Sequence, residues 1–256
     1  MTLTFLGTGT STGIPVLGCN CSVCHSNDPR DRRLRTSALI TTTDGRHILI
    51  DCGPDVRAQL LANNTTSIDG VIITHNHYDH VGGLDDLRTL SYKNGIDVYT
   101  TTDVATYLRQ TLPYCFSDNV YPNIPRLQLK TIAPLQPFDL AGLNILPLPV
   151  THGMMPIVGF RIGPLAYITD ASIVPYSTIE AVQGIDTLVI NSLRITPNPT
   201  HMNLEQSLDI ISRIAPRRAY LIHMSHQMGP HATATGKLPQ GVEFAYDGLQ
   251  ISLPQF

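Results

Sequence analysis

The stretch His75-Asn76-His77-Tyr78-Asp79-His80 decides how this chain is interpreted. It follows directly on the apolar run Val71–Thr74, which is typical of a buried strand. Three imidazoles and one carboxylate are therefore expected at a strand tip and in the loop beyond it. These side chains suit zinc, manganese or iron, and a set dense in His and Asp favours a metal that stays open to water and substrate. The alternative is a polar loop with incidental histidines.

Three further strand-like runs end on a residue type that binds metals. They are Leu146–Thr151 before His152, Ala166–Thr169 before Asp170, and Ala219–Ile222 before His223. The ends of neighbouring strands open onto a shared edge of a sheet, where α/β proteins bind ligands. We therefore expect these residues to form one convergent site with the first motif. The alternative is a set of unrelated polar residues at strand ends.

The composition fits a compact globular enzyme, with 42% apolar and 14% charged residues among 256. No segment has the character of a linker, so we expect one domain over residues 1–256. The net charge of −3 gives long polyanions no overall attraction, and no long nucleic acid partner is expected. No apolar run approaches the roughly 18 residues that span a membrane, and Met1–Leu6 is interpreted as a strand and not as a signal peptide. We expect a cytoplasmic protein.

Strand-like and helix-like segments alternate along the chain, which predicts two sheets covered by helices. Strands are expected at Leu3–Leu6, Ser37–Thr42, His47–Asp51, Val71–Thr74, Leu127–Ile132, Leu143–Val150, Ile157–Ile162, Leu165–Thr169, Thr187–Ile190 and Ala219–Ile222. Helices are expected at Asp55–Leu61, Leu84–Tyr92, Asp103–Thr111, Pro175–Val182 and Leu204–Ile214, with Thr102 and Asn203 as N-caps. The span 93–136 is rich in Pro, Tyr and Asn and is expected to form an irregular flap.

The cysteines predict a second metal site. Cys19, Cys21 and Cys24 are clustered, whereas Cys52 and Cys115 are isolated. Clustering in an intracellular chain points to metal, and isolated cysteines are typically small buried apolar residues. Buried free thiols are the alternative for the cluster.

The H-x-H-x-D-H motif, followed by the lone His152, Asp170 and His223, resembles the metallo-β-lactamase superfamily over nearly the whole chain. Its fold is an α/β (α+β) four-layer αβ/βα sandwich. The segments Leu6–Gly9, Gly18–Cys24 and His223–Gln227, with Tyr246-Asp247-Gly248, are similar to those of the PhnP-type cyclic phosphodiesterases. That subgroup opens phosphoribosyl 1,2-cyclic phosphate, and some members open 2′,3′-cyclic nucleotides.

The resemblance implies two catalytic divalent metals, manganese or zinc, and one structural zinc. The first catalytic metal would be held by His75, His77 and His152; the second by Asp79, His80 and His223; and Asp170 would bridge them. Asp51 would orient a ligand histidine, or it is a turn residue. The structural zinc would take Cys19, Cys21, Cys24 and His226, a closed Cys₃His set.

The resemblance also implies a mechanism, with His201 and the ligand Asp79 as catalytic residues. His201, just ahead of the helix expected at Leu204–Ile214, would give a proton to the leaving oxygen of the ester. The expected substrate is a small phosphodiester, and a homodimer is possible by analogy. Other residues remain open. His25 is an alternative zinc ligand, and His231 is a loop residue that could face the substrate. The Arg30–Arg35 run is either a solvated face or a patch that steers phosphate.

Three rival functions share parts of this pattern. A non-catalytic accessory protein of the pyrroloquinoline quinone biosynthesis type shares the fold and a zinc-bound cysteine cluster, but its dinuclear site is degenerate. A metallo-hydrolase acting on RNA would carry a flexible basic arm, and none is evident here. A thioesterase shares the ligand set, but the cysteine cluster and the Ser225-His226-Gln227 segment speak against it. The number of bound metals separates the accessory protein from the enzymes.

Overall fold

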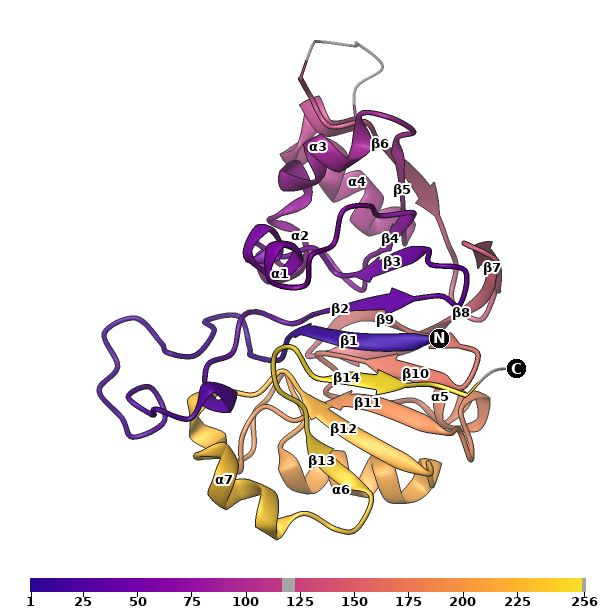
Figure 1. Cartoon of the computed structure of the whole chain (residues 1–256). Helices are drawn as coiled ribbons and strands as arrows, with labels where there is room; N and C mark the ends of the chain where they lie inside the picture. The colour runs from indigo at the N-terminus through magenta and orange to yellow at the C-terminus, as the bar shows by residue number, and fades with distance from the viewer. Residues whose placement is uncertain (117–122, 255–256) are drawn as a thin grey trace.

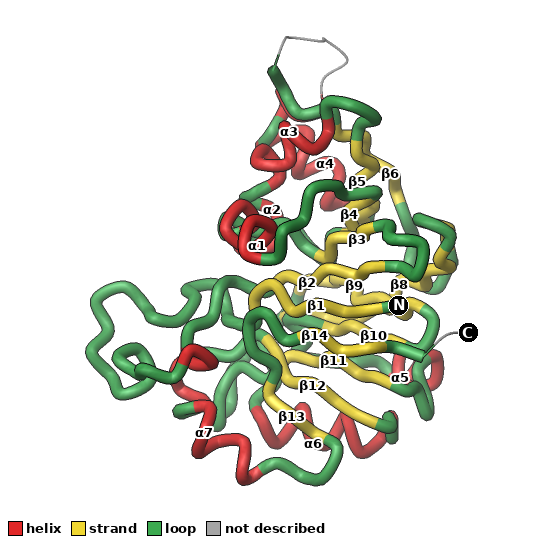
Figure 2. Tube along the Cα trace, in the orientation of Figure 1, coloured by secondary structure: helices red, strands yellow, loops and turns green. Residues whose placement is uncertain are grey.

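The computed structural model describes residues 1–116 and 123–254. Two seven-stranded sheets face each other, and helices cover both outer faces (Figures 1 and 2). The predicted four-layer αβ/βα sandwich is therefore confirmed. The extent of the single domain, 1–256, stays a prediction.

The first sheet has the strand order β14-β1-β2-β3-β4-β5-β6. Its strands are β1 (Thr2–Gly7), β2 (Ser37–Thr41), β3 (His47–Ile50), β4 (Gly70–Ile72), β5 (Ile96–Thr100), β6 (Leu127–Thr131) and β14 (Gln250–Ser252). The second sheet has the order β13-β12-β11-β10-β9-β8-β7. Its strands are β7 (Phe138–Leu140), β8 (Leu143–His152), β9 (Met155–Ile162), β10 (Leu165–Ile168), β11 (Thr187–Asn191), β12 (Arg218–Ile222) and β13 (Val242–Phe244). Both sheets mix parallel and antiparallel pairs.

The central strands are apolar on both faces because each sheet is covered on both sides. Ile48 and Ile50 of β3 pack in the core between the sheets, whereas Leu49 between them packs against the helices of the first sheet. In β10, Tyr167 belongs to the core between the sheets and Ile168 to the core under the helices of the second sheet. This alternation produces the continuous apolar runs seen in the sequence.

Short helices cover the two outer faces (Figure 2). The first sheet carries α1 (Val56–Ala62), α2 (Tyr78–Val81), α3 (Arg88–Ser91) and α4 (Thr102–Thr111), and the second carries α5 (Tyr176–Ala181), α6 (Leu204–Ile214) and α7 (His231–Ala234). The 3₁₀ helices are η1 (Pro29–Asp31), η2 (Leu84–Leu87), η3 (Pro113–Phe116), η4 (His226–Met228) and η5 (Thr235–Lys237). Asn203 caps α6, as predicted, in a reciprocal pair of bonds with Gln206. None of the described helices has the length and apolar character needed to cross a membrane.

The elements differ from the prediction at several places. The single helix predicted at Leu84–Tyr92 is divided into η2 and α3, and α4 begins one residue earlier than expected, after Thr101. The residues after His77 form the one-turn helix α2 where a loop was predicted. The four short strands β5, β7, β13 and β14 were not predicted.

The flap predicted over 93–136 is wrong for most of its length. The segment contains β5, α4, η3 and β6, and these elements belong to the first sheet and its helical cover. The helix and the strand predicted within it, at Asp103–Thr111 and Leu127–Ile132, are present as α4 and β6, and Val98 of the unpredicted β5 is buried with them. Residues 117–122 of this segment lie outside the described residues.

Candidate metal centre

The four predicted strand ends meet at one edge of the sandwich. The potential ligand atoms there fall into two groups, and within each group all of the atoms lie within 4.8 Å of one another. We call the group His75, His77 and His152 the first pocket, and the group Asp79, His80, Asp170 and His223 the second pocket; together they form the His/Asp centre. All of these side chains are buried except His77. The structure thus brings together the seven residues that the sequence singled out.

Both sheets contribute to the His/Asp centre. His75 and His77 follow β4 of the first sheet, and α2 presents the next two ligand residues. The loop after β3 packs tightly on α2 at Gly53: a Cβ atom at this position would lie only 2.1 Å from the carbonyl oxygen of Asp79, so a larger residue would clash. The other three residues come from the ends of β8, β10 and β12 in the second sheet. A shift between the sheets would therefore disperse the centre.

Three residues at the centre have left-handed backbone conformations. The φ angles of Asp51, Asp170 and His223 are 59°, 59° and 58°. Such conformations cost non-glycine residues about 1–3 kcal/mol and persist only where the surrounding structure imposes them. They turn each side chain back from its strand end towards the centre.

Hydrogen bonds to Nδ1 orient three of the histidines. His80 Nδ1 lies 2.7 Å from Asp51 Oδ2, so Asp51 does orient a histidine of the centre, as predicted. His152 Nδ1 lies 2.7 Å from the Thr200 carbonyl oxygen, and His75 Nδ1 lies 2.9 Å from the Thr74 hydroxyl. Partners of this kind fix the ring and its tautomer in metal sites and leave Nε2 for the metal.

The donor set fits a pair of divalent cations. His75 Nε2 and His80 Nε2 are buried without a hydrogen-bond partner among the described residues. His80 Nε2 nevertheless lies 3.2 Å from Asp79 Oδ2 and 3.3 Å from Asp170 Oδ2. Buried polar atoms without partners are costly, and a cation shared by imidazole and carboxylate would satisfy them. Nitrogen and oxygen ligands of this kind suit zinc and manganese.

The charges within the centre also suit metal binding. Burial lowers the pKa of His75 well below its usual value and that of His223 to about 4, so both are neutral near pH 7. Burial raises the pKa of Asp170, but His223 and His80 outweigh it and hold this carboxyl ionised. Burial lowers the pKa of His80, yet Asp170 and the other neighbouring carboxylates raise it well above its usual range. Neutral imidazoles and ionised carboxylates are the forms that bind metals. His75, His223 and Asp170 are already in these forms, whereas His80 would release its proton when a metal binds.

His201 lies at the edge of the centre, in the loop before α6. Its Nε2 is 3.1 Å from Asp170 Oδ1, and its ring stacks on His223 with centroids 5.0 Å apart. Its side chain keeps 15% exposure, more than that of Asp170 at 2%. With His152 and Asp170 it forms a third group of potential ligands. The position suits a proton donor that faces solvent and substrate, and it also allows metal binding.

The three clustered cysteines surround His226. Its Nδ1 lies 3.3 Å from the sulfur of Cys19, 3.5 Å from that of Cys21 and 3.4 Å from that of Cys24. In a tetrahedral site with Zn–S near 2.3 Å and Zn–N near 2.0 Å, sulfur and nitrogen stand about 3.5 Å apart. The residues therefore fit the predicted Cys₃His site, which we call the Cys₃His cluster. Cys52 and Cys115 are buried, as predicted.

The weaker histidine candidates lie elsewhere. His25 Nε2 bonds the side chain of Asn20 at 3.1 Å and is outside the Cys₃His cluster. His231 was considered as a loop residue near the substrate. It is instead buried at the start of α7, where its Nδ1 lies 3.1 Å from an Arg33 nitrogen.

The arginine run does not form one patch. Arg33 is buried and donates to the Thr8 hydroxyl and to the Ala245 carbonyl. Arg30 is paired with Asp28, and Arg35 with Asp55. The contacts of Arg33 with Ala245 and of Arg35 with Asp55 hold the loop between β1 and β2, residues 8–36, against the rest of the fold, whereas the Arg30–Asp28 pair lies within the loop. They give no support to phosphate steering by this run.

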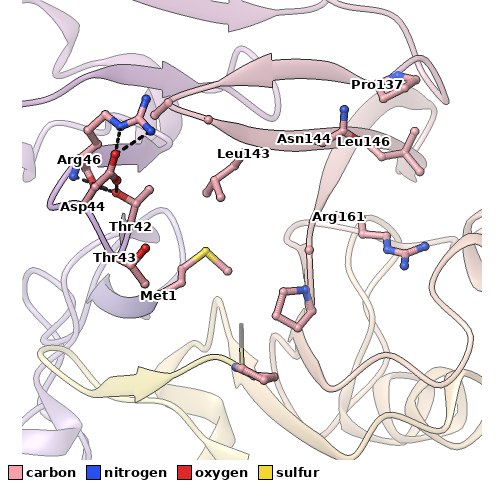
Figure 3. Close-up of a pocket in the computed structure, with 15 residues that line it drawn as sticks. Met1, Thr42, Thr43, Asp44, Arg46, Pro137, Leu143, Asn144, Leu146 and Arg161 are labelled. Carbon is pink, nitrogen blue, oxygen red and sulfur yellow. Dashed lines mark hydrogen bonds and ion pairs between the residues drawn. The ribbon is translucent and has the colours of Figure 1, made fainter. Parts of the chain in front are cut away.

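A cavity of about 890 Å³ lies away from the His/Asp centre. It is bounded by Met1, the turn after β2 and the turn between β7 and β8, with Leu143 on its wall (Figure 3). The Arg46 and Asp44 side chains on its rim bind each other. None of the candidate metal ligands lines it. We therefore place the chemistry at the His/Asp centre, because its side chains converge and this cavity holds no comparable group.

Sequence reasoning missed the residues that support the ligands. Thr10, Thr36, Thr74 and Thr200 all contact histidines of the centre. Thr74 precedes its partner directly, and that adjacency was the one available signal. Thr200 likewise precedes His201, which its hydroxyl contacts, but its bond to His152 and the bonds of Thr10 and Thr36 to His223 join residues far apart in the chain, so no spacing pattern marks them.

Comparison with known proteins agrees with the fold and the motif. Residues 46–224 match the model of the Beta-lactamase superfamily domain. A solved structure described as a new diphosphatase from the PhnP family is 37% identical, with a TM-score of 0.91, and the match covers 98% of this chain and 96% of that one. Zinc-bound PqqB from Methylobacterium extorquens has a TM-score of 0.81 at 21% identity over 99% of this chain and 100% of that one, which supports the fold alone.

A curated relative from Porphyromonas gingivalis has a different name. It is called an octanoyltransferase and is 43% identical over 251 residues, which is 98% of this chain. The chain spans about half of that protein, because the match covers 51% of its length. The name therefore describes a protein about twice as long.

Proposed function

Since the chain belongs to the β-lactamase superfamily, we propose that it is a metal-dependent phosphodiesterase that opens a small cyclic phosphodiester. Phosphoribosyl 1,2-cyclic phosphate and 2′,3′-cyclic nucleotides are the substrates that the PhnP-type resemblance favours. The observation that carries the proposal is the convergence of seven ligand-type side chains, with His201 3.1 Å from Asp170. The 37% identity to a PhnP-family structure supports the subgroup.

The roles follow from the two pockets. His75, His77 and His152 would hold one divalent cation, and Asp79, His80 and His223 the other. Asp170 would bridge them, since it belongs to the second pocket and its carboxylate also lies within 4.8 Å of a ring nitrogen of His152, a residue of the first pocket. The Cys₃His cluster would hold a structural zinc.

Two divalent cations held there would supply hydroxide near neutral pH and neutralise charge on the phosphoryl oxygens. The chain's own residues do the rest. Asp51, Thr74 and the Thr200 carbonyl keep the imidazole rings directed at the centre. His201 gives the proton from Nε2 to the departing ribose oxygen, and Asp170 Oδ1, 3.1 Å from this nitrogen, holds the ring in position.

A second candidate is the hydrolysis of a diphosphate at the same centre. The similar PhnP-family structure is described as a diphosphatase, and a cation pair serves both kinds of phosphoryl ester or anhydride. An accessory protein of the PqqB type, a thioester hydrolase and an RNA nuclease remain rivals with partial support from the fold.

The test is a hydrolysis screen with the purified protein loaded with manganese or zinc. The panel contains a 2′,3′-cyclic nucleotide, phosphoribosyl 1,2-cyclic phosphate, a linear bis-aryl phosphodiester, a nucleoside diphosphate, an octanoyl thioester and a short RNA. We expect the highest kcat/KM on one cyclic phosphodiester. A preference for the diphosphate would select the second candidate.

Asp170→Asn is the control for contaminating activity in this screen. Its loss of turnover on the preferred substrate would assign the activity to the His/Asp centre. Preferred cleavage of the thioester or RNA would contradict the proposal, and so would no turnover on the whole panel by protein that carries its metals.

A further inference from the structure

The imidazole of His223 lies between two threonines of the loop 8–36. Its Nδ1 lies 3.0 Å from the hydroxyl of Thr36, and its Nε2 lies 3.1 Å from the hydroxyl of Thr10. All three side chains are buried. The two threonines are at opposite ends of the loop, which leaves β1 near Thr10 and enters β2 just after Thr36. The start of the loop therefore contacts Nε2 of the ring, and the end of the loop contacts Nδ1.

The direction of the hydrogen bond between Thr36 and His223 follows from the other bond that the Thr36 hydroxyl makes. The Thr36 hydroxyl donates to the carbonyl oxygen of Gly9 at 2.8 Å, and a carbonyl oxygen can only accept. The single hydroxyl proton is thereby used. Thr36 must then accept from His223 Nδ1, so the proton of the neutral ring is on Nδ1. Nε2 is left with a lone pair that accepts from the Thr10 hydroxyl or binds a metal, and Asp170 Oδ1 is 3.1 Å from this nitrogen.

The backbone of His223 does not hold the ring in place unaided. Its φ of 58° is left-handed, a conformation that surrounding contacts must impose. The loop 8–36 supplies such contacts next to it: Met224 donates to the Thr8 carbonyl at 3.0 Å, and Thr10 donates to the Met224 carbonyl at 3.0 Å. The same loop thus fixes both the backbone and the ring.

The first pocket is supported by other parts of the chain. His152 is held by the Thr200 carbonyl before α6, and His75 by Thr74 after β4. Neither contact involves the loop 8–36. The loop 8–36 therefore supports a histidine of the second pocket and neither of these two histidines of the first, so a change in the loop should affect the second pocket selectively.

We propose that Thr36 is a positioning residue that fixes the tautomer of His223 and thereby sets the metal affinity of the second pocket. The inference rests on the proposed dinuclear site. Thr10 has the opposite relation to the metal, because its hydroxyl donates to the same Nε2 lone pair that a metal would use. Replacement of each threonine by valine should consequently have different effects on the metal affinity of the second pocket.

The experiment compares Thr36→Val and Thr10→Val, two isosteric losses of a hydroxyl on one imidazole. Each protein is depleted of its catalytic metals and titrated with Mn²⁺ alone by calorimetry. We expect Thr36→Val to weaken Mn²⁺ binding at the second pocket about 10–100-fold, the range for the loss of a residue that hydrogen-bonds a metal ligand. Binding at the first pocket should be unchanged. Thr10→Val should bind within about threefold of the wild type, or more tightly. Thr36→Ser should restore wild-type affinity.

Imidazole ¹⁵N NMR of the metal-depleted proteins tests the tautomer directly. We expect His223 to carry its proton on Nδ1 in the wild type and to lose this preference in Thr36→Val. Equal weakening in both valine variants would mean that the loop has merely loosened and would overturn the proposal. Unchanged second-site affinity in Thr36→Val, or a proton on Nε2 in the wild type, would overturn it too. A wild type that binds one Mn²⁺ but shows the Nδ1 tautomer would instead count against the dinuclear function.

Discussion

The His/Asp centre and the Cys₃His cluster are built in opposite ways. The centre draws its ligands from strand ends of both sheets, and nearly all of them are buried. The cluster takes three of its four residues from six positions of one loop, and it is only partly buried. The first arrangement depends on the whole fold, whereas the second needs the loop and the turn that carries His226.

The difference matches the chemistry that each site suits. The three cysteine sulfurs lie 3.3–3.5 Å from His226 Nδ1, and these four ligands would complete the tetrahedron of a zinc ion and leave no position for substrate. The His/Asp centre mixes imidazole and carboxylate and has the partly exposed His201 at its edge. Under the proposed function, a stabilising metal and the reactive metals would occupy separate sites, although His223 and His226 are three residues apart.

Asp170→Asn should have the largest effect, a loss of activity at the His/Asp centre that leaves the Cys₃His cluster intact. Loss of the shared carboxylate removes charge from the second pocket, and we expect kcat to fall at least about 10³-fold, equivalent to several kcal/mol of transition-state stabilisation. Zinc in the Cys₃His cluster should stay. Turnover and elemental analysis check both, with Asp86→Asn on the exposed side of η2 as the matched control. Retained turnover would remove Asp170 from the centre of the mechanism.

His201→Ala distinguishes a proton donor from an additional metal ligand. If His201 protonates the leaving oxygen, kcat should fall about 10²–10⁴-fold with the metal content unchanged. An ester with an activated aryl leaving group needs less protonation, so its hydrolysis should be affected less. A loss of bound metal in this variant would instead make His201 a ligand, beside His152 and Asp170.

Acid should destabilise the His/Asp centre. Burial lowers the pKa of His223 to about 4, whereas an unfolded histidine titrates near 6.5. The unfolded chain therefore binds more protons as the pH falls through this window, and the protein depleted of its catalytic metals should lose about 3 kcal/mol of stability between pH 6.5 and 4. His75 acts in the same direction. His80, whose pKa is raised, keeps its contribution below pH 6.5 and does not offset the loss.

Urea denaturation at several pH values measures this dependence. The midpoint should fall steadily from pH 6.5 downwards in the wild type, and His223→Asn should flatten the decline. An unchanged midpoint between pH 6.5 and 5 would show that the buried imidazoles are not held neutral.

Cys21→Ser should have the smallest effect on catalysis and a clear effect on stability. We expect loss of about one zinc per chain and a lower Tm, because the metal ties the loop 8–36 to the His226 turn. Activity should stay within a few fold of the wild type. Cys115→Ser, a loss of a buried thiol elsewhere, is the control. Full zinc content and an unchanged Tm in Cys21→Ser would argue for free thiols.

The sequence predicted the fold and the ligand candidates well where the signal is local. The apolar run before His75 and the runs before His152, Asp170 and His223 are continuous because their strands are covered on both faces. The short strands β7, β13 and β14 were missed because three residues at a sheet edge give no periodicity. The helix α2 was missed because it is only four residues long and two of them, Asp79 and His80, are polar ligand candidates.

The supporting shell of the centre was not predictable from one sequence. Thr36 and His223 are 187 positions apart, and Thr10 and His223 are 213 apart. Threonine in a strand or loop has no pattern that reveals a distant partner. Asp51 was identified by its place after a strand, but its bond to His80 depends on the left-handed turn that the fold imposes.

Anomalous diffraction from crystals grown with both manganese and zinc tests the central claim most directly. Data collected on both sides of each absorption edge identify the element at every site. We predict three sites per chain: zinc within the Cys₃His cluster, and a pair about 3.5–4 Å apart in the His/Asp centre with Asp170 between them. A centre that holds no metal pair while its imidazoles turn away from one another would contradict the account.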